Sequence, residues 1–471
     1  MPSSNAIRMD GFILSPGKTF KVFSAPSQND EELQGMNESA EKGAALAEKV
    51  EDTIQQRLEK ELLLEQRASA AGETLRQKLL KQIGGSVENI QPVVLVSAIF
   101  DLAVTSRATD IHFDPSESGM VARLRIDGML HDVLTIPKRI QPNIVARVKV
   151  LGEMDISETR RPQDGHISMT SGNNRFDLRV SALPTFRGEK LTLRLLDSTS
   201  GIPKLEELGM EYSDRVIFED IITKPQGMTL VTGPTGSGKT TTLYAALERI
   251  NYRTYNIITL EDPVEYQLKG VNQVQINPAI DLTFASTLRA SLRQDPDTIL
   301  VGEVRDLETA AIAIRAAMTG HRVFSTIHAN TAPDAINTLV NMNVRPFLIT
   351  SSLLCILAQR LVRKLCTQCR EPYEPEPELV KELEVKEKPE KLYRASGCDA
   401  CNKTGYLGRT AVYELLRLTP SIKRAIIDGR SIEQIVKTAH SEGMKSLFEK
   451  GVNKILEGTT SVDEVFRVLR F

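Results

Sequence analysis

The chain has 471 residues, 41% hydrophobic and 25% charged, which is enough for two or three domains that each bury a core. Its net charge of −2 gives no basis for a global nucleic-acid or anionic-membrane binding surface. Residues 1–21 lack a signal-peptide pattern, and no window reaches the ~18–20 apolar residues of a membrane span. We therefore expect a cytosolic protein that reaches a membrane only through partners.

The N-terminal segment, residues 1–90, predicts a variable tail followed by a helical linker. Residues 1–40 are rich in Ser, Asn, Gly and Pro, which is typical of a mobile tail or a small module. Residues 41–83 are dominated by Ala, Leu, Glu, Lys and Gln, a composition that indicates a helix. This helix can serve as a docking helix or short coiled coil, or it can be an ordinary solvated linker. The sequence leaves both interpretations open.

Residues 91–200 predict an α+β domain. A helix over 93–105 is followed by short alternating strands, with hairpin turns at 127–128 and 171–174. The clearest predicted strands cover 111–113, 120–126, 176–180 and 190–196. Gly-Ile-Pro at 201–203 marks the boundary to the next domain.

Residues 201–471 predict a larger domain in which strands alternate with helices. This alternation, from 205 to 365, indicates a mostly parallel sheet covered by helices. A cysteine-bearing insertion over 366–401 follows, and a helical tail over 422–471 ends the sequence. Cys355 lies in an apolar stretch that predicts a helix, in which its thiol is expected to be buried.

Residues 233–240 read Gly-Pro-Thr-Gly-Ser-Gly-Lys-Thr, a complete Gly-x4-Gly-Lys-Thr phosphate loop. The apolar run 228–231 predicts a strand before it, and 240–247 predict a helix after it. In this setting backbone N–H groups cradle phosphate oxygens at the positive end of the helix. Lys239 can reach the β and γ phosphates, and the Thr240 hydroxyl can take a place on Mg²⁺. The predicted nucleotide-binding residues are Gly233, Pro234, Thr235, Gly236, Ser237, Gly238, Lys239, Thr240 and Thr241.

Two further predicted strands end in acidic residues. The strand over 255–260 delivers Glu261 to the carboxyl edge of the sheet, where ligands bind in open α/β folds. A carboxylate there can orient water, hold Mg²⁺ indirectly, bind a neighbouring subunit or simply be solvated. The strand over 298–302 ends in Glu303, the expected place for a water-activating base or a carboxylate of the Mg²⁺ shell. Gly302 stands where many phosphate-loop ATPases have Asp, so we expect Mg²⁺ to rely on Thr240, phosphate oxygens and water.

A third predicted strand, over 322–326, is followed by His328. Its polar Ser-Thr-x-His end can sense whether the γ phosphate is present, although a single histidine is more often a structural hydrogen-bonding group. The position of His328 after a third strand of the same sheet favours the sensing role.

Four of the five cysteines form two Cys-x2-Cys pairs, Cys366 with Cys369 and Cys398 with Cys401. Four thiolates suit a tetrahedral Zn²⁺ site that has no open coordination position, whereas a redox dithiol needs only one pair. We therefore predict a structural zinc that folds a segment too small for its own core. The charged stretch 371–391 between the pairs is expected to be a solvated arm.

Taken in order, these motifs resemble the secretion and pilus-assembly ATPases of bacterial type II secretion and type IV pili, over residues 92–471. The matching boxes are the Walker A loop at 233–240, the acidic Asp box at 261–265, the atypical Walker B at 302–303 and the His box at 319–330. Residues 109–112, 123–128 and 160–165 resemble the N-terminal core domain of the family. The resemblance implies an α/β fold with a RecA-like P-loop NTPase core behind an upstream α+β (PAS-like) domain. It also implies that Glu303 is the catalytic glutamate and Lys239 the nucleotide-binding lysine.

The resemblance further implies a homohexameric ring, which gives arginines of the α+β domain a role. An arginine from a mobile domain or a neighbouring chain can stabilise charge in phosphoryl transfer, whereas the alternative is a solvated or locally paired arginine. The candidates in the α+β domain are Arg161, Arg179 and Arg194, and Arg289 and Arg293 are further candidates on a helix that faces the same site. The predicted catalytic residues are Glu303, Lys239, Glu261, His328, Arg179 and Arg194.

We therefore predict a hexameric, cytoplasmic Mg²⁺-ATPase, peripheral to the inner membrane, that powers pilin or pseudopilin assembly in pilus extension or type II secretion. Its expected partners are an inner-membrane platform protein and cytoplasmic docking proteins, with no direct contact to nucleic acid. A pilus retraction ATPase is one alternative, which the tetracysteine element disfavours because retraction-type members generally lack it. The others are a nucleotide-gated scaffold and a nucleic-acid translocase of the same fold, the latter disfavoured by the modest charge.

Overall fold

The computed structural model describes residues 62–85, 87, 90–171, 174–197, 201–250 and 253–470. The predicted N-terminal tail at 1–40 and most of the following segment lie outside the described residues. Residues 64–471 form one compact unit. Within the described ranges, no helix combines the length and apolar character needed to cross a bilayer.

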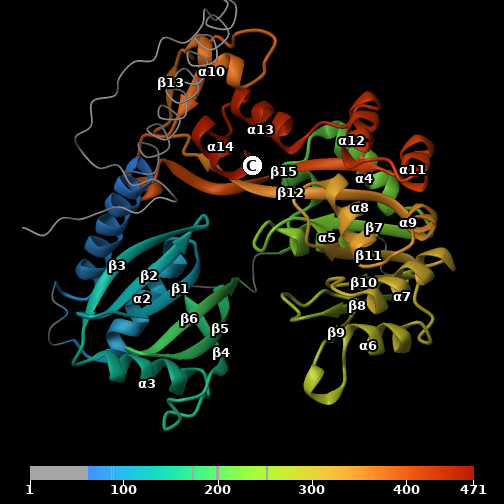
Figure 1. Cartoon of the computed structure of the whole chain (residues 1–471). Coiled ribbons are helices and arrows are strands. Elements are labelled where there is room, and N and C mark those ends of the chain that lie inside the picture. The colour runs from blue at the N-terminus through green and yellow to red at the C-terminus, as the bar shows by residue number, and fades with distance from the viewer. Residues whose placement is uncertain are drawn as a thin grey trace, which may run out of the picture. The chain divides into compact units, whose positions relative to one another are not determined.

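The upstream part is built on a six-stranded antiparallel sheet with strand order β3-β2-β1-β6-β5-β4 (Figure 1). Its elements are α2 (Pro92–Thr105), β1 (Ala108–Pro115), β2 (Gly119–Ile126), β3 (Met129–Pro137), α3 (Gln141–Leu151), β4 (Gln163–Ser171), β5 (Asn174–Thr185) and β6 (Gly188–Asp197). Alternate strand residues are buried with the apolar sides of α2 and α3 in one core. The predicted helix over 93–105 and the four predicted strands are confirmed.

The two-residue turn between β2 and β3 sets the register of this strand pair. Asp127 and Gly128 have φ of 49° and 86°, so both central residues adopt the left-handed conformation that two-residue hairpins of the β-sheet twist require. The other predicted turn falls largely on residues 172–173, which lie outside the described residues. Upstream, residues 64–82 are helical, and Leu75 and Leu79 are fully buried in the same core as α2. The described part of the predicted linker helix therefore packs into the same core as α2 and the six-stranded sheet.

The downstream part is built on a seven-stranded sheet with order β15-β12-β7-β11-β10-β8-β9. All neighbouring pairs are parallel except β12 with β15, so the expected mostly parallel sheet is confirmed. Its strands are β7 (Gly227–Thr232), β8 (Ile257–Glu261), β9 (Asn272–Gln275), β10 (Thr298–Val301), β11 (Arg322–Ile327), β12 (Leu353–Leu365) and β15 (Tyr406–Arg417). Its helices include α4 (Tyr212–Ile222), α5 (Lys239–Arg249), α6 (Phe284–Ser291), α7 (Leu307–Met318), α8 (Ala332–Asn341) and α9 (Pro346–Ser352).

Helices cover both faces of this sheet, because its strands are apolar on both sides. On β10, Ile299 and Val301 belong to the core that includes α7 and α8, whereas Leu300 belongs to the core that includes α4 and α5. The predicted helical tail is confirmed as α11 (Pro420–Ile427), α12 (Ile432–Ser441), α13 (Leu447–Leu456) and α14 (Val462–Leu469). These four helices join the core on the α7 and α8 side.

One expectation was wrong, and a second is confirmed only in part. Cys355 is buried as expected, but it lies in strand β12 and not in a helix. The strand lies between β7 and β15 and is buried along almost its whole length, so its continuous apolar run lacks the alternation that distinguishes a strand. The charged stretch 371–391 is not simply a solvated arm. It holds β13 (Glu371–Tyr373) and α10 (Pro377–Glu382), with β14 (Leu392–Arg394) directly after it, and Leu383 and Leu392 are buried in the main core.

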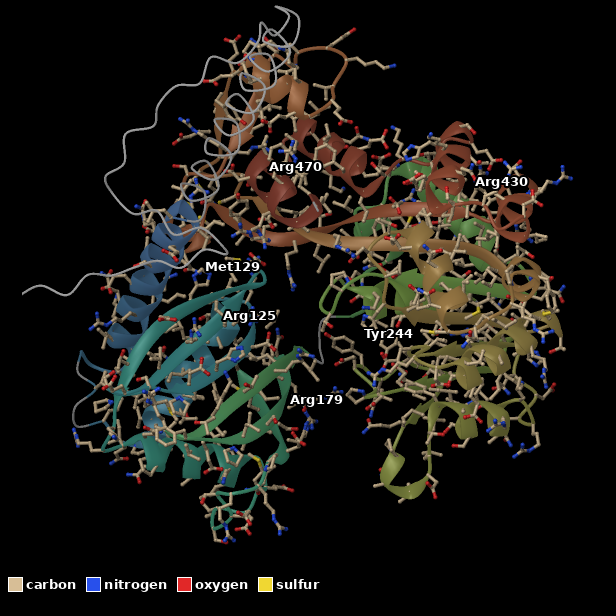
Figure 2. The ribbon with its side chains drawn as sticks, in the orientation of Figure 1. Arg125, Met129, Arg179, Tyr244, Arg430 and Arg470 are labelled. Atoms are coloured by element: carbon tan, nitrogen blue, oxygen red, sulfur yellow. The ribbon has the colours of Figure 1, made fainter. Side chains whose placement is uncertain are left out.

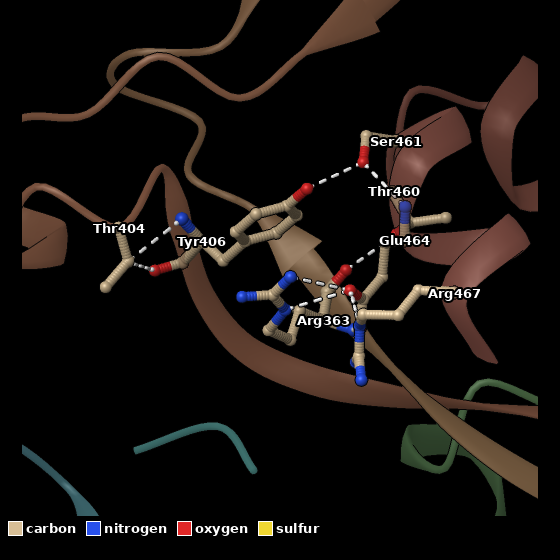
Figure 3. A network of polar contacts seen from close by, with 7 residues as sticks. All are labelled: Arg363, Thr404, Tyr406, Thr460, Ser461, Glu464 and Arg467. Atoms are coloured by element: carbon tan, nitrogen blue, oxygen red, sulfur yellow. Dashed lines mark hydrogen bonds and ion pairs between the residues drawn. The ribbon is translucent and has the colours of Figure 1, made fainter. Parts of the chain in front are cut away.

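A buried ionic network attaches the last helix to the sheet (Figure 3). Glu464 on α14 is fully buried and accepts from the Arg363 guanidinium at 2.7 and 3.0 Å and from Arg467 at 2.6 and 2.9 Å. Arg363 also lies 4.0 Å from the centre of the Tyr406 ring, whose hydroxyl bonds Ser461 at 2.7 Å. Burial favours the neutral acid, but Arg467 and Arg363 outweigh it and lower the pKa of Glu464.

Replacing Glu464 by Gln is expected to lower the free energy of unfolding by about 3–5 kcal/mol, because two guanidinium groups lose their buried counterion. Because the folded-state pKa is lowered, the stabilisation is present above the ordinary carboxyl pKa and is lost as the pH falls through the folded value. Urea denaturation of both proteins at neutral and acidic pH measures this, and the difference should shrink in acid. Glu382→Gln, which breaks the exposed pair with Arg470, is the matched control and should cost under about 1 kcal/mol. An equal effect of both substitutions would contradict the role of burial.

Candidate functional site

The phosphate loop connects the end of β7 to the start of α5, as its sequence predicts. Gly233 has φ of 148°, and a Cβ there would lie 2.5 Å from the Gln359 carbonyl oxygen, so both conformation and space require glycine. Gly238, directly before α5, is also left-handed with φ of 87°. The loop therefore turns tightly around the positive end of the helix, the arrangement that binds phosphate groups.

Lys239 is the first residue of α5, and its side chain folds over the loop. Its Nζ donates to the carbonyl oxygens of Gly233 at 2.9 Å and Pro234 at 3.1 Å. Burial lowers the pKa of Lys239; the charge of Glu303 opposes this shift, and the charge of Arg360 adds to it. The ammonium group thus lies in the field of Glu303, which follows β10, the second strand from β7 in the sheet.

Glu303 and His328 come together at the carboxyl edge of the sheet. Glu303 follows β10, His328 follows β11, and these strands are parallel neighbours. The Glu303 side chain is 13% exposed and its Oε2 lies 3.5 Å from His328 Nε2, while Arg305 pairs with its Oε1. A carboxylate held by a histidine and an arginine, beside a phosphate loop, is placed to accept a proton from water or to orient it.

Gly302 explains the absence of an acid at the position before Glu303. A Cβ on Gly302 would lie 3.0 Å from the Leu260 carbonyl oxygen and 3.4 Å from Glu261 Cα. An Asp side chain here, as many phosphate-loop ATPases carry, would need the backbone of β8 to shift by a few tenths of an ångström.

Glu261 sits at the end of β8 but lies inside a hydrogen-bonded network. Only 3% of the residue is exposed, and its carboxylate accepts from Thr259 at 2.6 Å, from Gln273 at 3.1 Å and from the Tyr244 hydroxyl. Tyr244 comes from α5 (Figure 2), and burial followed by the charge of Glu261 raises its pKa. Glu261 thus connects β8 to the helix that begins at the phosphate loop.

The structure places two of the candidate arginines side by side. Arg179 on β5 and Arg194 on β6 are cross-strand partners, and Arg194 Nε lies 3.2 Å from Asp110 Oδ1. Arg179 pairs with Glu265 at 3.3 Å and donates to the Val264 carbonyl oxygen.

The remaining candidates lie elsewhere. Arg289 on α6 pairs with Glu308, and Arg293 donates to the Arg289 carbonyl oxygen at 3.0 Å. Arg161 is exposed in the segment between α3 and β4. The hydroxyls of Ser325 and Thr326, in front of His328, donate to carbonyl oxygens of Val301 and Gly302 at 2.7 Å each.

Sequence reasoning missed two polar residues of β12 that line the phosphate loop. Gln359 Nε2 donates to the Ser237 carbonyl oxygen at 2.6 Å, and Arg360 is 4% exposed beside Gly233. The only signal in the sequence is a Gln-Arg pair inside an otherwise apolar run. Read as a helix, that run gives no reason to bring the pair to the loop.

The four paired cysteines gather into a single cluster with the size of a zinc site. All four Sγ atoms lie within 4.8 Å of one another, with separations of 3.9 Å for Cys366 and Cys398, 3.8 Å for Cys369 and Cys401, and 3.8 Å for Cys398 and Cys401. A tetrahedral zinc with Zn–S distances of about 2.3 Å requires sulfur atoms about 3.8 Å apart. Backbone N–H groups of Cys398 and Gly405 also donate to Cys401 Sγ at 3.2 Å, which stabilises a thiolate. The donor set therefore fits Zn²⁺ in a closed, structural site.

Purified protein is expected to contain about one zinc ion per chain. Cys369→Ser should lose most of this metal, because three thiolates and a hydroxyl bind zinc more weakly than four thiolates. Cys355→Ala removes a thiol outside the cluster and should keep the zinc. Metal analysis by mass spectrometry measures all three. Freshly purified protein with four titratable cluster thiols and no metal would contradict the assignment.

The sequence and the structure of this chain were compared with those of known proteins, and both comparisons find relatives. Residues 86–467 match a family model described as Type II/IV secretion system protein. Type II secretion system protein E of Pseudomonas aeruginosa is 47% identical over 385 residues, covering 81% of this chain and 76% of the relative. The type IV pilus assembly ATPase PilB of Myxococcus xanthus is 43% identical over 392 residues, covering 82% and 69%. The crystal structure of the pilus retraction motor PilT with bound ADP superposes with a TM-score of 0.53 at 27% identity, covering 78% of this chain and 95% of PilT.

Proposed function

The chain belongs to the Type II/IV secretion system protein family, and from that membership we propose that it is a Mg²⁺-dependent ATPase that powers pilin or pseudopilin assembly. The observation that carries the proposal is the convergence of the phosphate loop, Lys239, Glu303 and His328 at one edge of the sheet. These groups supply the phosphate cradle, a cation and a base that hydrolysis of a phosphoanhydride requires.

In this proposal each residue has one task. Loop residues 233–241 bind the triphosphate, and the Thr240 hydroxyl takes a place on Mg²⁺. Lys239 balances charge on the phosphates, and Glu303 orients or deprotonates the attacking water. His328, whose ring lies 3.5 Å from Glu303, senses whether the γ phosphate is present and passes this on to the carboxylate through their contact. Glu261 does not contact the nucleotide; it accepts a hydrogen bond from Tyr244 and so holds α5, the helix that begins at the phosphate loop, in position.

The assembly is proposed as a homohexamer in which Arg179 and Arg194 complete a nucleotide site. The support for this role is that the two arginines are cross-strand partners on β5 and β6, although each also pairs with a carboxylate of its own chain, Arg179 with Glu265 and Arg194 with Asp110. We assign 91–200 to this α+β domain, in the PAS-like class, and 201–471 to a RecA-like ATPase domain. Residues 1–90 are proposed to select an inner-membrane platform and cytoplasmic docking proteins. Crosslinking from this segment in cells would identify the membrane partner.

Assembly is favoured over retraction by two observations. The pilus assembly and secretion relatives are 43–47% identical to this chain, whereas the retraction motor PilT is 27% identical. The chain also carries the complete tetracysteine cluster, the element that the assembly branch is expected to have.

Steady-state phosphate release by the purified chain tests the proposed activity. Turnover should require Mg²⁺ and ATP and should be unchanged by added duplex or single-stranded DNA. A protein that binds ATP but releases no phosphate would be a nucleotide-gated scaffold. Turnover stimulated by DNA and lost steeply with added salt would instead indicate a translocase.

A further inference from the structure

Strand β12 brings a buried cation to the phosphate loop. The strand pairs with β7 up to Ala358 opposite Thr232, so the next residues, Gln359 and Arg360, extend alongside the loop itself. A Cβ on Gly233 would lie 3.3 Å from an Arg360 guanidinium nitrogen. Arg360 therefore touches the first turn of the loop from the side of the sheet.

The same guanidinium holds the segment that follows β11. Arg360 Nη2 donates to the Asn330 carbonyl oxygen at 3.0 Å and lies 3.3 Å from Asn330 Oδ1. Asn330 is two residues beyond His328, whose ring faces Glu303 at 3.5 Å. One planar side chain thus contacts both the phosphate loop and the segment that presents His328.

Arg360 also lies in the field of a buried acid. The acid whose charge acts on Arg360 is Glu414, and that carboxylate accepts from the backbone N–H groups of Ala332 at 2.7 Å and Leu447 at 3.2 Å. Burial lowers the pKa of Arg360, with Glu414 opposing, and burial also raises the pKa of Glu414. A cation kept at such a buried position, with hydrogen bonds to backbone carbonyl oxygens, serves to fix those carbonyls in place.

We propose that Arg360 is a positioning residue that locks the His328 segment to the phosphate loop, so that a seated triphosphate and the pair of Glu303 and His328 are aligned together. This inference rests on the proposed ATPase function and adds a residue of β12 to it. The planar fork is required, because a single ammonium group cannot hold Asn330 and also lie against Gly233. Since Arg360 acts through His328, its loss should affect turnover more than ATP binding.

A double-mutant cycle with His328 tests the proposal. Arg360→Gln and His328→Ala should each lower kcat for ATP by about tenfold or more, since small misplacements of catalytic groups cost up to about 10²-fold. The double variant should be no slower than the slower single variant, because both changes disable one unit. KM for ATP should change less than about threefold in Arg360→Gln. Lys364→Gln, which removes an exposed cation from the same strand, is the control and should match the wild type.

Several outcomes would overturn the inference. They are wild-type kcat in Arg360→Gln, a double variant whose loss is the product of the two single losses, or a loss confined to KM. If Arg360→Gln does not fold, Arg360→Lys keeps the charge and is measured in the same cycle. Wild-type kcat in that variant would refute the need for the planar fork. ATP hydrolysis by the wild type and by Lys364→Gln tests the proposed ATPase function separately. If both turn over normally, that function stands even when the role inferred for Arg360 is refuted.

Discussion

Replacing Glu303 by Gln is expected to lower ATP turnover by about 10²–10⁴-fold, the range that loss of a general base produces. Glutamine keeps the size of the side chain but cannot accept a proton. The residue does not hold the fold together, because its partners, His328 and Arg305, have side chains that are 54% and 66% exposed. ATP binding should therefore persist. Phosphate release and equilibrium binding of a fluorescent ATP analogue measure the two properties separately.

Glu457→Gln is the matched control, since it removes an exposed carboxylate after α13 and should leave both properties unchanged. Turnover of Glu303→Gln within about threefold of the wild type would remove Glu303 from the proposed mechanism. If Glu303→Gln lost ATP binding as well as turnover, the role of Glu303 would be to maintain the structure of the binding pocket. A tight-binding, inactive Glu303→Gln protein would also be a useful trap for the nucleotide-bound state.

The phosphate loop and its strands could be predicted from sequence because their chemistry is local. Gly233, Gly238 and Lys239 are close in the chain, and their spacing alone dictates a tight turn that opens a helix. Glu303 and His328 were placed correctly at strand ends because parallel strands share a carboxyl edge. The cysteine cluster could also be predicted, because all four ligands lie in two short Cys-x2-Cys pairs.

The contribution of β12 could not be predicted, because it depends on contacts between distant parts of the chain. The hydrogen bond from Gln359 to Ser237 spans 122 positions, and nothing in the local pattern distinguishes it from a solvated amide. The strand is buried by both neighbours and by helices, so its apolar run resembles a buried helix. For Glu261, at the end of β8, the sequence left several roles open. Its hydrogen bonds with Tyr244, Thr259 and Gln273 join distant parts of the chain and could not be predicted from the local pattern.

Lys239→Ala is expected to weaken ATP binding and to abolish measurable hydrolysis. A hydrogen bond to a charged group contributes about 1.5–3 kcal/mol, which corresponds to about a 10- to 150-fold increase in Kd. The loss in turnover should be larger, because the same ammonium group balances charge that develops on the phosphates during the reaction. Titration of the ATP analogue and phosphate release at saturating ATP measure these two effects.

The structure makes this substitution a clean test of the site. Lys239 donates to the carbonyl oxygens of Gly233 and Pro234 within its own loop, so its removal should leave α5 and the melting temperature nearly unchanged. Lys437→Ala, which removes an exposed lysine from α12, is the control for loss of one positive charge. If Lys239→Ala hydrolyses ATP at a rate near that of the wild type, the phosphate loop is not the catalytic pocket. Because the roles proposed for Glu303 and His328 require a nucleotide bound in that loop, those roles would then lose their basis as well.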